Sequence, residues 1–118
     1  LGMGVDWRRR TPRLATGVGG YSGVAIKPVA LRCAFQVAQA VSIPVIGCGG
    51  IQCAEDVMEY LVVGCQAVQV GTVSFSDPTV LARMGQELEE LLHSEGIETL
   101  SECIGTLQLS QAEPWRKA

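Results

Sequence analysis

Between residues 28 and 41 the apolar side chains recur every three or four positions, a pattern that predicts an amphipathic helix. Its buried face is expected to consist of Leu31, Ala34, Phe35, Ala38 and Val41. Pro28 suits the first turn of this helix, because the N–H group that proline lacks would have no partner there. The residue before Pro44 disfavours helix, so we expect the helix to end by then and a strand to follow.

The next segments predict a strand, a second helix and a second strand. Residues 44–46 are continuously apolar, as expected of a parallel strand that is covered on both faces. Four residues, three of them glycines, then lead to a stretch with helical spacing. The apolar positions of that stretch are Ala54, Val57, Met58, Leu61 and Val62. Residues 67–70 form the second apolar strand, which ends at Gly71 and Thr72.

A long closing helix is predicted after residue 76. Asp77 can cap its start and Pro78 suits its first turn. The buried stripe is expected to comprise Val80, Leu81, Met84, Leu88, Leu91 and Leu92. Gly96 ends the helix, and residues 100–104 add a short final turn.

The start of the middle helix has one local weakness. Cys53 stands where a Ser or Thr would cap the helix, three residues before Asp56. A thiol is a poor acceptor, and its presence costs on the order of 1 kcal/mol of local helix stability. An anion bound at this helix start would partly offset the loss, because the free N–H groups and the helix dipole favour negative charge.

Residues 1–20 have no helical period. They alternate loosely around three consecutive arginines, which predicts a surface hairpin or excursion. The arginines suit a solvated turn better than a phosphate clamp. The glycines at positions 17, 19, 20 and 23 form a loop that either faces a ligand or serves as a flexible connector, and their spacing alone does not decide between the two.

The two glycine-rich strand ends are the strongest candidate site. A right-handed helical crossover between parallel strands places both carboxyl ends on the same edge of the sheet. Gly49, Gly50, Gly71 and Thr72 can therefore close on one phosphate, as the loops after the last two strands do in many (β/α)8 barrels. The alternative is that these glycines only make tight turns.

Composition and length limit the class of protein. The chain has 118 residues, of which 47% are hydrophobic, so it can bury a core, yet it is far shorter than the roughly 250 residues of a closed barrel. We therefore expect part of a barrel. The net charge of −3 offers no basic footprint for nucleic acid. The sequence contains no run of about 18 apolar residues, which is the length that would predict a membrane span.

The residue types that commonly carry chemistry are sparse. The five cysteines, an odd number without CxxC spacing, predict reduced, buried or half-buried thiols in a cytosolic protein. Cys48 and Cys53 lack the second ligand pair that a metal site needs. The single histidine, His93, is better placed to complement a helix C-terminus than to transfer protons. Chemistry here is expected to depend on a cofactor or on residues beyond this chain.

Several blocks, in this order and spacing, resemble the C-terminal part of a dihydroorotate dehydrogenase catalytic subunit. They are residues 19–32, 43–51, 54–57, 70–72 and 101–105. The resemblance is strongest to the soluble bacterial type that pairs with an iron–sulfur flavoprotein subunit. It implies an α/β fold, the C-terminal portion of a TIM (β/α)8 barrel. Residues 1–23 would be an excursion, residues 24–105 the βα units and closing helix, and residues 106–118 a tail.

The resemblance also implies a cofactor, a reaction and site residues. The cofactor is FMN, with Gly23 near its ring or ribityl region and Gly49, Gly50, Gly71 and Thr72 on its phosphate. The reaction is oxidation of dihydroorotate to orotate in cytoplasmic pyrimidine synthesis. The implied partners are a second copy of the chain and an FAD and iron–sulfur subunit that links to NAD.

The catalytic base of the family, a cysteine or serine, precedes the point where this chain starts. None of the five cysteines aligns with it, and Lys27 is not the family's flavin lysine. We therefore expect the isolated 118 residues to be nearly inactive and to aggregate or form oligomers. The alternatives are a dihydropyrimidine dehydrogenase and a truncated barrel segment that binds a phosphorylated ligand or none. Fumarate or quinone remains open as the electron acceptor.

Overall fold

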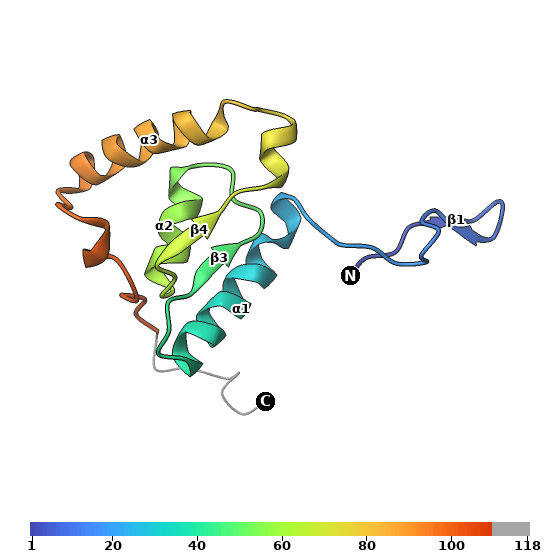
Figure 1. Cartoon of the computed structure of the whole chain (residues 1–118), viewed down its shortest axis with the longest axis horizontal. Helices are drawn as coiled ribbons and strands as arrows, with labels where there is room; N and C mark the ends of the chain where they lie inside the picture. Colours follow the sequence, from blue (N-terminus) through green and yellow to red (C-terminus); the bar gives the residue numbers. More distant parts are fainter. Residues whose placement is uncertain (110–118) are drawn as a thin grey trace.

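A computed structural model of the protein describes residues 1–109. Its central part alternates helices and strands, and a hairpin arm precedes it (Figure 1). The elements are β1 (Val5–Asp6), β2 (Thr11–Pro12), η1 (Val24–Ile26), α1 (Lys27–Ala40), β3 (Ile46–Cys48), α2 (Ala54–Val62), β4 (Ala67–Gln69), η2 (Thr72–Phe75), α3 (Val80–Glu95) and η3 (Leu100–Glu102). The predicted tail is described only to residue 109, and its remainder lies outside the described residues.

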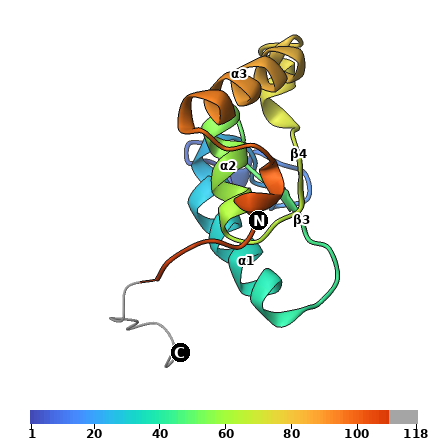
Figure 2. The ribbon, with the colours of Figure 1, turned by 90° about the vertical axis from the view of Figure 1, so that its left-hand side faces the viewer.

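β3 and β4 form a parallel pair joined by α2, so their carboxyl ends share one edge of the sheet. Ile46 pairs with Ala67 and Cys48 with Gln69. Helices α1 and α2 lie together on one side of the strands, and α3 packs against α2 (Figure 2). This arrangement positions everything that follows the two strands at a common edge.

The core lies between the sheet and its helices. Its buried members come mainly from α2, from the segment that follows it and from α3, and they are Ile51, Val57, Tyr60, Leu61, Val63, Cys65, Val80 and Met84. The opposite face of the two strands is uncovered. Ile46 is 58% exposed there, and Cys48 and Gln69 are exposed as well. The prediction that the first strand is covered on both faces therefore does not hold within this chain.

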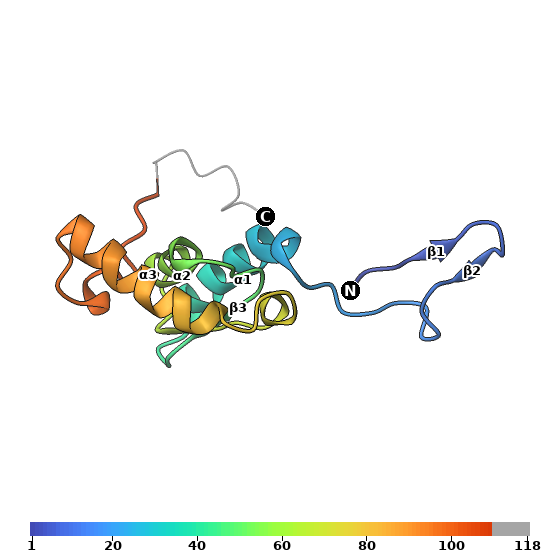
Figure 3. The same ribbon diagram turned by 90° about the horizontal axis from the view of Figure 1, so that it is seen from above.

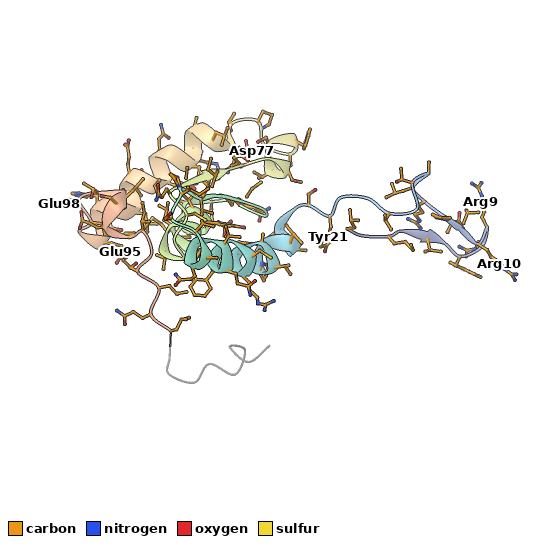
Figure 4. All side chains as sticks on the ribbon, turned by 60° about the horizontal axis from the view of Figure 1, so that its bottom comes forward. Arg9, Arg10, Tyr21, Asp77, Glu95 and Glu98 are labelled. Carbon is orange, nitrogen blue, oxygen red and sulfur yellow. The ribbon has the colours of Figure 1, made fainter. Side chains whose placement is uncertain are left out.

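Residues 1–23 form an arm that extends away from the helices (Figures 1 and 3). The predicted hairpin is present, with β1 and β2 antiparallel and the three arginines in its turn. Arg9 and Arg10 lie at the tip, and Tyr21 lies where the arm joins the remainder (Figure 4). Trp7 is 71% exposed, and none of the arm's residues is buried.

The helix boundaries follow the sequence patterns closely at α1 and α2. The predicted buried face of α1 is only half-buried at Leu31, Ala34, Phe35 and Ala38, and Val41 is 42% exposed, so full burial of that face was wrong. Pro28 stands in the first turn of α1, and Gly96 ends α3 in the left-handed conformation. The strand boundaries differ from the predicted residues 44–46 and 67–70. Strand β3 begins only at Ile46, and β4 already ends at Gln69. Pro44 has no N–H with which to join a ladder, and the pairing starts only after Gln66 donates to the Val45 carbonyl.

Helix α3 begins two residues later than predicted. Asp77 accepts hydrogen bonds from the backbone N–H and the hydroxyl of Thr79, so it makes a turn before the helix instead of capping it directly. Leu81, predicted in the buried stripe, is 58% exposed. Only Val80 and Met84 of that stripe are fully buried, because α2 covers a narrow strip of the helix.

Candidate functional site

All five predicted site residues line one cavity of about 310 Å³. Gly49 and Gly50 follow β3, Gly71 and Thr72 follow β4, and Gly23 comes from the segment that precedes α1. The cavity therefore lies at the carboxyl edge of the parallel pair, where three segments distant in sequence meet. The sequence predicted that the two strand ends close on one site, and the structure places both of them on one cavity together with Gly23.

The backbone after β3 requires glycine at two consecutive positions. Gly49 has φ 135° and Gly50 has φ 70°, both in the region that side chains rarely adopt. A Cβ on Gly49 would lie 2.7 Å from the Cβ of Ala30, and one on Gly50 would lie 2.7 Å from the Cβ of Lys27. The loop consequently packs directly on the start of α1, with its bare backbone at the cavity wall.

The segments that contain Gly23 and Thr72 form the other two walls and approach each other across the cavity. A Cβ on Gly23 would lie 3.9 Å from the methyl group of Thr72, so these two segments nearly touch. Gly71 has φ −125° and ψ −88°, outside the usual helical and extended regions, and open space where a Cβ would stand. Because no side chain stands there, the backbone of Gly71 is open to the cavity.

The cavity presents hydrogen-bond donors and no carboxylate. Within residues 1–109, the backbone N–H groups of Gly50, Gly71 and Thr72 donate no hydrogen bond. The hydroxyls of Ser22 and Thr72 belong to the lining, and no Asp or Glu does. Because unpaired backbone N–H groups favour anionic acceptors, the lining suits a phosphate group.

An ion cluster beneath the cavity joins α1 to α2. Lys27 Nζ donates to Asp56 Oδ1 and lies 2.9 Å from Glu59 Oε2. Asp56 Oδ2 in turn accepts the backbone N–H of Gln52 at 2.7 Å. Burial acts to raise the pKa of Asp56, but the ammonium of Lys27 and the N–H of Gln52 outweigh it and lower that pKa. Hydrogen bonds to the two carboxylates raise the pKa of Lys27.

The start of α2 differs in one respect from the expectation that it would receive the anion. Cys53 is the N-cap and makes no side-chain cap bond, as predicted. However, the acidic first turn of α2, Glu55 and Asp56, already supplies negative charge there. The short helix η2, which begins at Thr72 on the cavity wall, is better placed, and (β/α)8 barrels commonly use such an extra helix for phosphate.

Two residues of the site were not anticipated from the sequence. Lys27 was expected only to open a helix, but it also holds the loop after β3 through Asp56 and Gln52. Tyr60 was not singled out, yet its hydroxyl donates to the Gly49 carbonyl. A buried tyrosine requires a partner for its hydroxyl, so its place on the apolar side of α2 was the signal available.

The cysteines correspond only in part to the expectation. Cys65 and Cys103 are buried and Cys53 is half-buried, but Cys33 and Cys48 are exposed, so the prediction of burial is wrong for those two. Cys48 is exposed because it faces the uncovered side of the sheet, where it lines the cavity. His93 lies in the last turn of α3, as predicted.

No metal cluster or membrane span is found in the described part of the chain. Among residues 1–109, His, Cys, Asp and Glu nowhere gather in a group of three or more that would suit a metal ion. The helices over the same residues are too short or too polar to cross a bilayer.

Comparison with known proteins gives one family. A family model described as dihydroorotate dehydrogenase matches residues 1–92. The NAD(+)-type dihydroorotate dehydrogenase B catalytic subunit of Maridesulfovibrio salexigens is 54% identical over 108 residues, which are 92% of this chain and 35% of that protein. The same subunit of Halalkalibacterium halodurans is 53% identical over 105 residues, 89% of this chain and 34% of that protein. A putative dihydroorotate dehydrogenase A (fumarate) of Solibacter usitatus is 48% identical over 108 residues, 92% of this chain and 36% of that protein.

Solved structures give the same answer for the fold. DHODH of Eimeria tenella in complex with ferulenol superposes with a TM-score of 0.70 and 28% identity, over 75% of this chain and 24% of that one. The ligand-free form superposes with a TM-score of 0.70 and 26% identity, over 86% and 30%. This chain is a partial (β/α)8 barrel that spans about a third of the length of the curated relatives it matches, and it belongs to the dihydroorotate dehydrogenase family.

Proposed function

We propose that these residues are the C-terminal part of a dihydroorotate dehydrogenase catalytic subunit and supply its FMN phosphate site. The observation that carries the proposal is the cavity lined by Gly23, Gly49, Gly50, Gly71 and Thr72, with free N–H groups on two strand ends. The similarity to named dihydroorotate dehydrogenases supports the assignment of the reaction, oxidation of dihydroorotate to orotate in pyrimidine biosynthesis.

In this proposal the chain's own groups bind and orient the cofactor. The N–H groups of Gly50, Gly71 and Thr72 and the Thr72 hydroxyl donate to the phosphate, and Gly23 leaves room for the ribityl or ring portion. The ammonium of Lys27 pairs with the Asp56 carboxylate, which offsets the repulsion between that carboxylate and the phosphate. The chemistry that FMN supplies when bound is acceptance of a hydride from the substrate.

The proton-transfer part of the reaction is assigned to residues outside this chain. We propose that the base, a cysteine or serine by the family resemblance, lies before Leu1 in the full-length protein, and we give Cys48 no such role. Relatives named as the catalytic subunit of an NAD(+) type support a separate partner subunit, which we propose carries FAD and an iron–sulfur cluster, whereas the Solibacter relative is named for fumarate. We further propose a cytoplasmic location and self-association.

The first experiment measures flavin binding in the full-length polypeptide that contains these residues. Wild-type protein is expected to retain FMN and to reduce it with dihydroorotate and not with dihydrouracil. Gly50→Ala is expected to lose FMN, because its Cβ would collide with Lys27 and with the Gly23 carbonyl. Gly85→Ala is the matched control, since Gly85 is exposed on α3 with nothing within 4 Å of an added Cβ.

Three outcomes contradict the proposal. A wild-type protein without bound flavin would remove the cofactor assignment. Reduction by dihydrouracil in preference to dihydroorotate would indicate a dihydropyrimidine dehydrogenase. Equal FMN retention by Gly50→Ala and Gly85→Ala would place the phosphate elsewhere.

A further inference from the structure

Tyr60 connects the buried core to the wall of the cavity. Its side chain is fully buried, and its ring lies directly on β3 at Gly47. A Cβ on Gly47 would stand 2.3 Å from Cδ1 of the ring, so only a glycine leaves room for it. From this position the hydroxyl reaches past the end of β3 and donates to the Gly49 carbonyl oxygen at 2.8 Å.

This hydrogen bond determines the orientation of the Gly49–Gly50 peptide. The peptide is trans and planar, so its C=O and N–H point in opposite directions. Because the carbonyl is directed to Tyr60 on the helix side, the N–H of Gly50 is directed away from α2. That N–H has no partner among residues 1–109, and Gly50 lines the cavity.

A peptide between two glycines needs such a restraint. Glycine populates positive and negative φ about equally, so the Gly49–Gly50 plane can rotate with little steric resistance from side chains of its own. Rotation by half a turn would replace the donor at the cavity wall with a carbonyl oxygen, which repels an anion. The buried hydroxyl opposes that rotation, because turning away would leave it without an acceptor.

We propose that Tyr60 is a positioning residue that holds the Gly50 N–H toward the ligand's phosphate. The inference rests on the proposed function, since it concerns the same cavity, and it adds a residue from the opposite side of the loop. Burial raises the pKa of Tyr60, so its hydroxyl remains a protonated donor at neutral pH.

The test compares FMN with riboflavin, which lacks the phosphate, on the full-length protein. Tyr60→Phe keeps the ring on Gly47 and removes only the hydroxyl. Its dissociation constant for FMN is expected to rise roughly tenfold, the effect of one lost hydrogen bond to a charged group. The dissociation constant for riboflavin is expected to stay unchanged. Both are measured by quenching of flavin fluorescence.

A second variant separates positioning from general loss of stability. Val80→Ala truncates a fully buried core residue of α3 that does not line the cavity. It is expected to lower the unfolding temperature while leaving the ratio of the two dissociation constants as in the wild type. Equal weakening of FMN and riboflavin by Tyr60→Phe, or no change in either, would overturn the inference.

An NMR measurement on the wild-type protein does not depend on whether the variant folds. In protein labelled with ¹³C and ¹⁵N in glycine, the Gly50 amide resonance is expected to shift when riboflavin is replaced by FMN. An unchanged resonance would overturn the inference. A wild-type protein that binds FMN no more tightly than riboflavin would instead refute the proposed phosphate site itself.

Discussion

The two faces of the β3–β4 pair differ sharply within the same six residues. On one face Gly47 lies beneath the ring of Tyr60, and α1 and α2 cover the strands. On the other face Ile46 is 58% exposed although it is one of the most apolar residues in the chain. Side chains of a strand alternate between faces, so the same three positions of β3 serve both environments.

The covered face packs against α1 and α2, whereas no element among residues 1–109 covers the open face. In a (β/α)8 barrel the side chains opposite the helices fill the interior together with those of other strands. The aligned residues of this chain cover only 35% and 34% of two curated relatives. The contrast between the faces therefore supports the proposal that further strands complete the interior, and three substitutions in the full-length protein test it.

The largest effect is expected on the covered face. Gly47→Ala would place a Cβ 2.3 Å from the ring of Tyr60 and 3.0 Å from Cys65 Sγ, so both must move. We expect a loss of about 3 kcal/mol in the free energy of unfolding, measured by urea denaturation. Gly85→Ala, with open space at its Cβ, serves as the control. A loss below about 1 kcal/mol would show that the ring does not depend on this glycine.

A slightly smaller effect is expected on the open face. If other strands cover Ile46 in the full-length protein, Ile46→Ala costs about 2–3 kcal/mol, as for a buried isoleucine. Leu81→Ala is the comparison, because Leu81 is also 58% exposed but lies on the outer helix layer. Its cost is expected to be below that of Ile46→Ala in the same denaturation experiment. Equal, small costs would mean that the open face stays in contact with solvent.

The smallest of the three effects concerns the ion cluster between the helices. Asp56→Asn is expected to cost about 2 kcal/mol at pH 7, because Lys27 and the Gln52 N–H lose a charged partner. Glu55→Gln, in the same helical turn but exposed, is the control and should cost far less.

The cost of Asp56→Asn should depend on pH in a defined direction. The pKa of Asp56 is lowered on folding, so its contribution is present above the usual 3.8 and is lost as pH falls through the lower folded value. The pKa of Lys27 is raised, so the contribution also declines as pH rises above 10.5 toward the folded value. A difference between wild type and variant that is constant from pH 2 to pH 7 would contradict this coupling.

Local patterns in the sequence were sufficient for much of the fold. The periodicity of α1 and α2, Pro28 in a first turn, Gly96 after α3 and Cys53 as a cap without a hydrogen bond all agree with the structure. Each depends on neighbours within about one helical turn. The exposure of Leu81 and the start of α3 were predicted wrongly. The first depends on how much of α3 packs against α2, and the second on the turn that Asp77 makes with Thr79.

The five site residues could be named from the sequence, since glycines after apolar strands and a family resemblance both indicate them. The crossover rule also predicted that the two strand ends converge, and all five residues line one cavity. The roles of Lys27 and Tyr60 behind the cavity were decided by tertiary structure. Periodicity records which side of an element is apolar, but not which distant backbone group a buried hydroxyl or ammonium will reach. That choice follows from how the helices pack on the strands, because buried polar groups must find partners wherever packing places them.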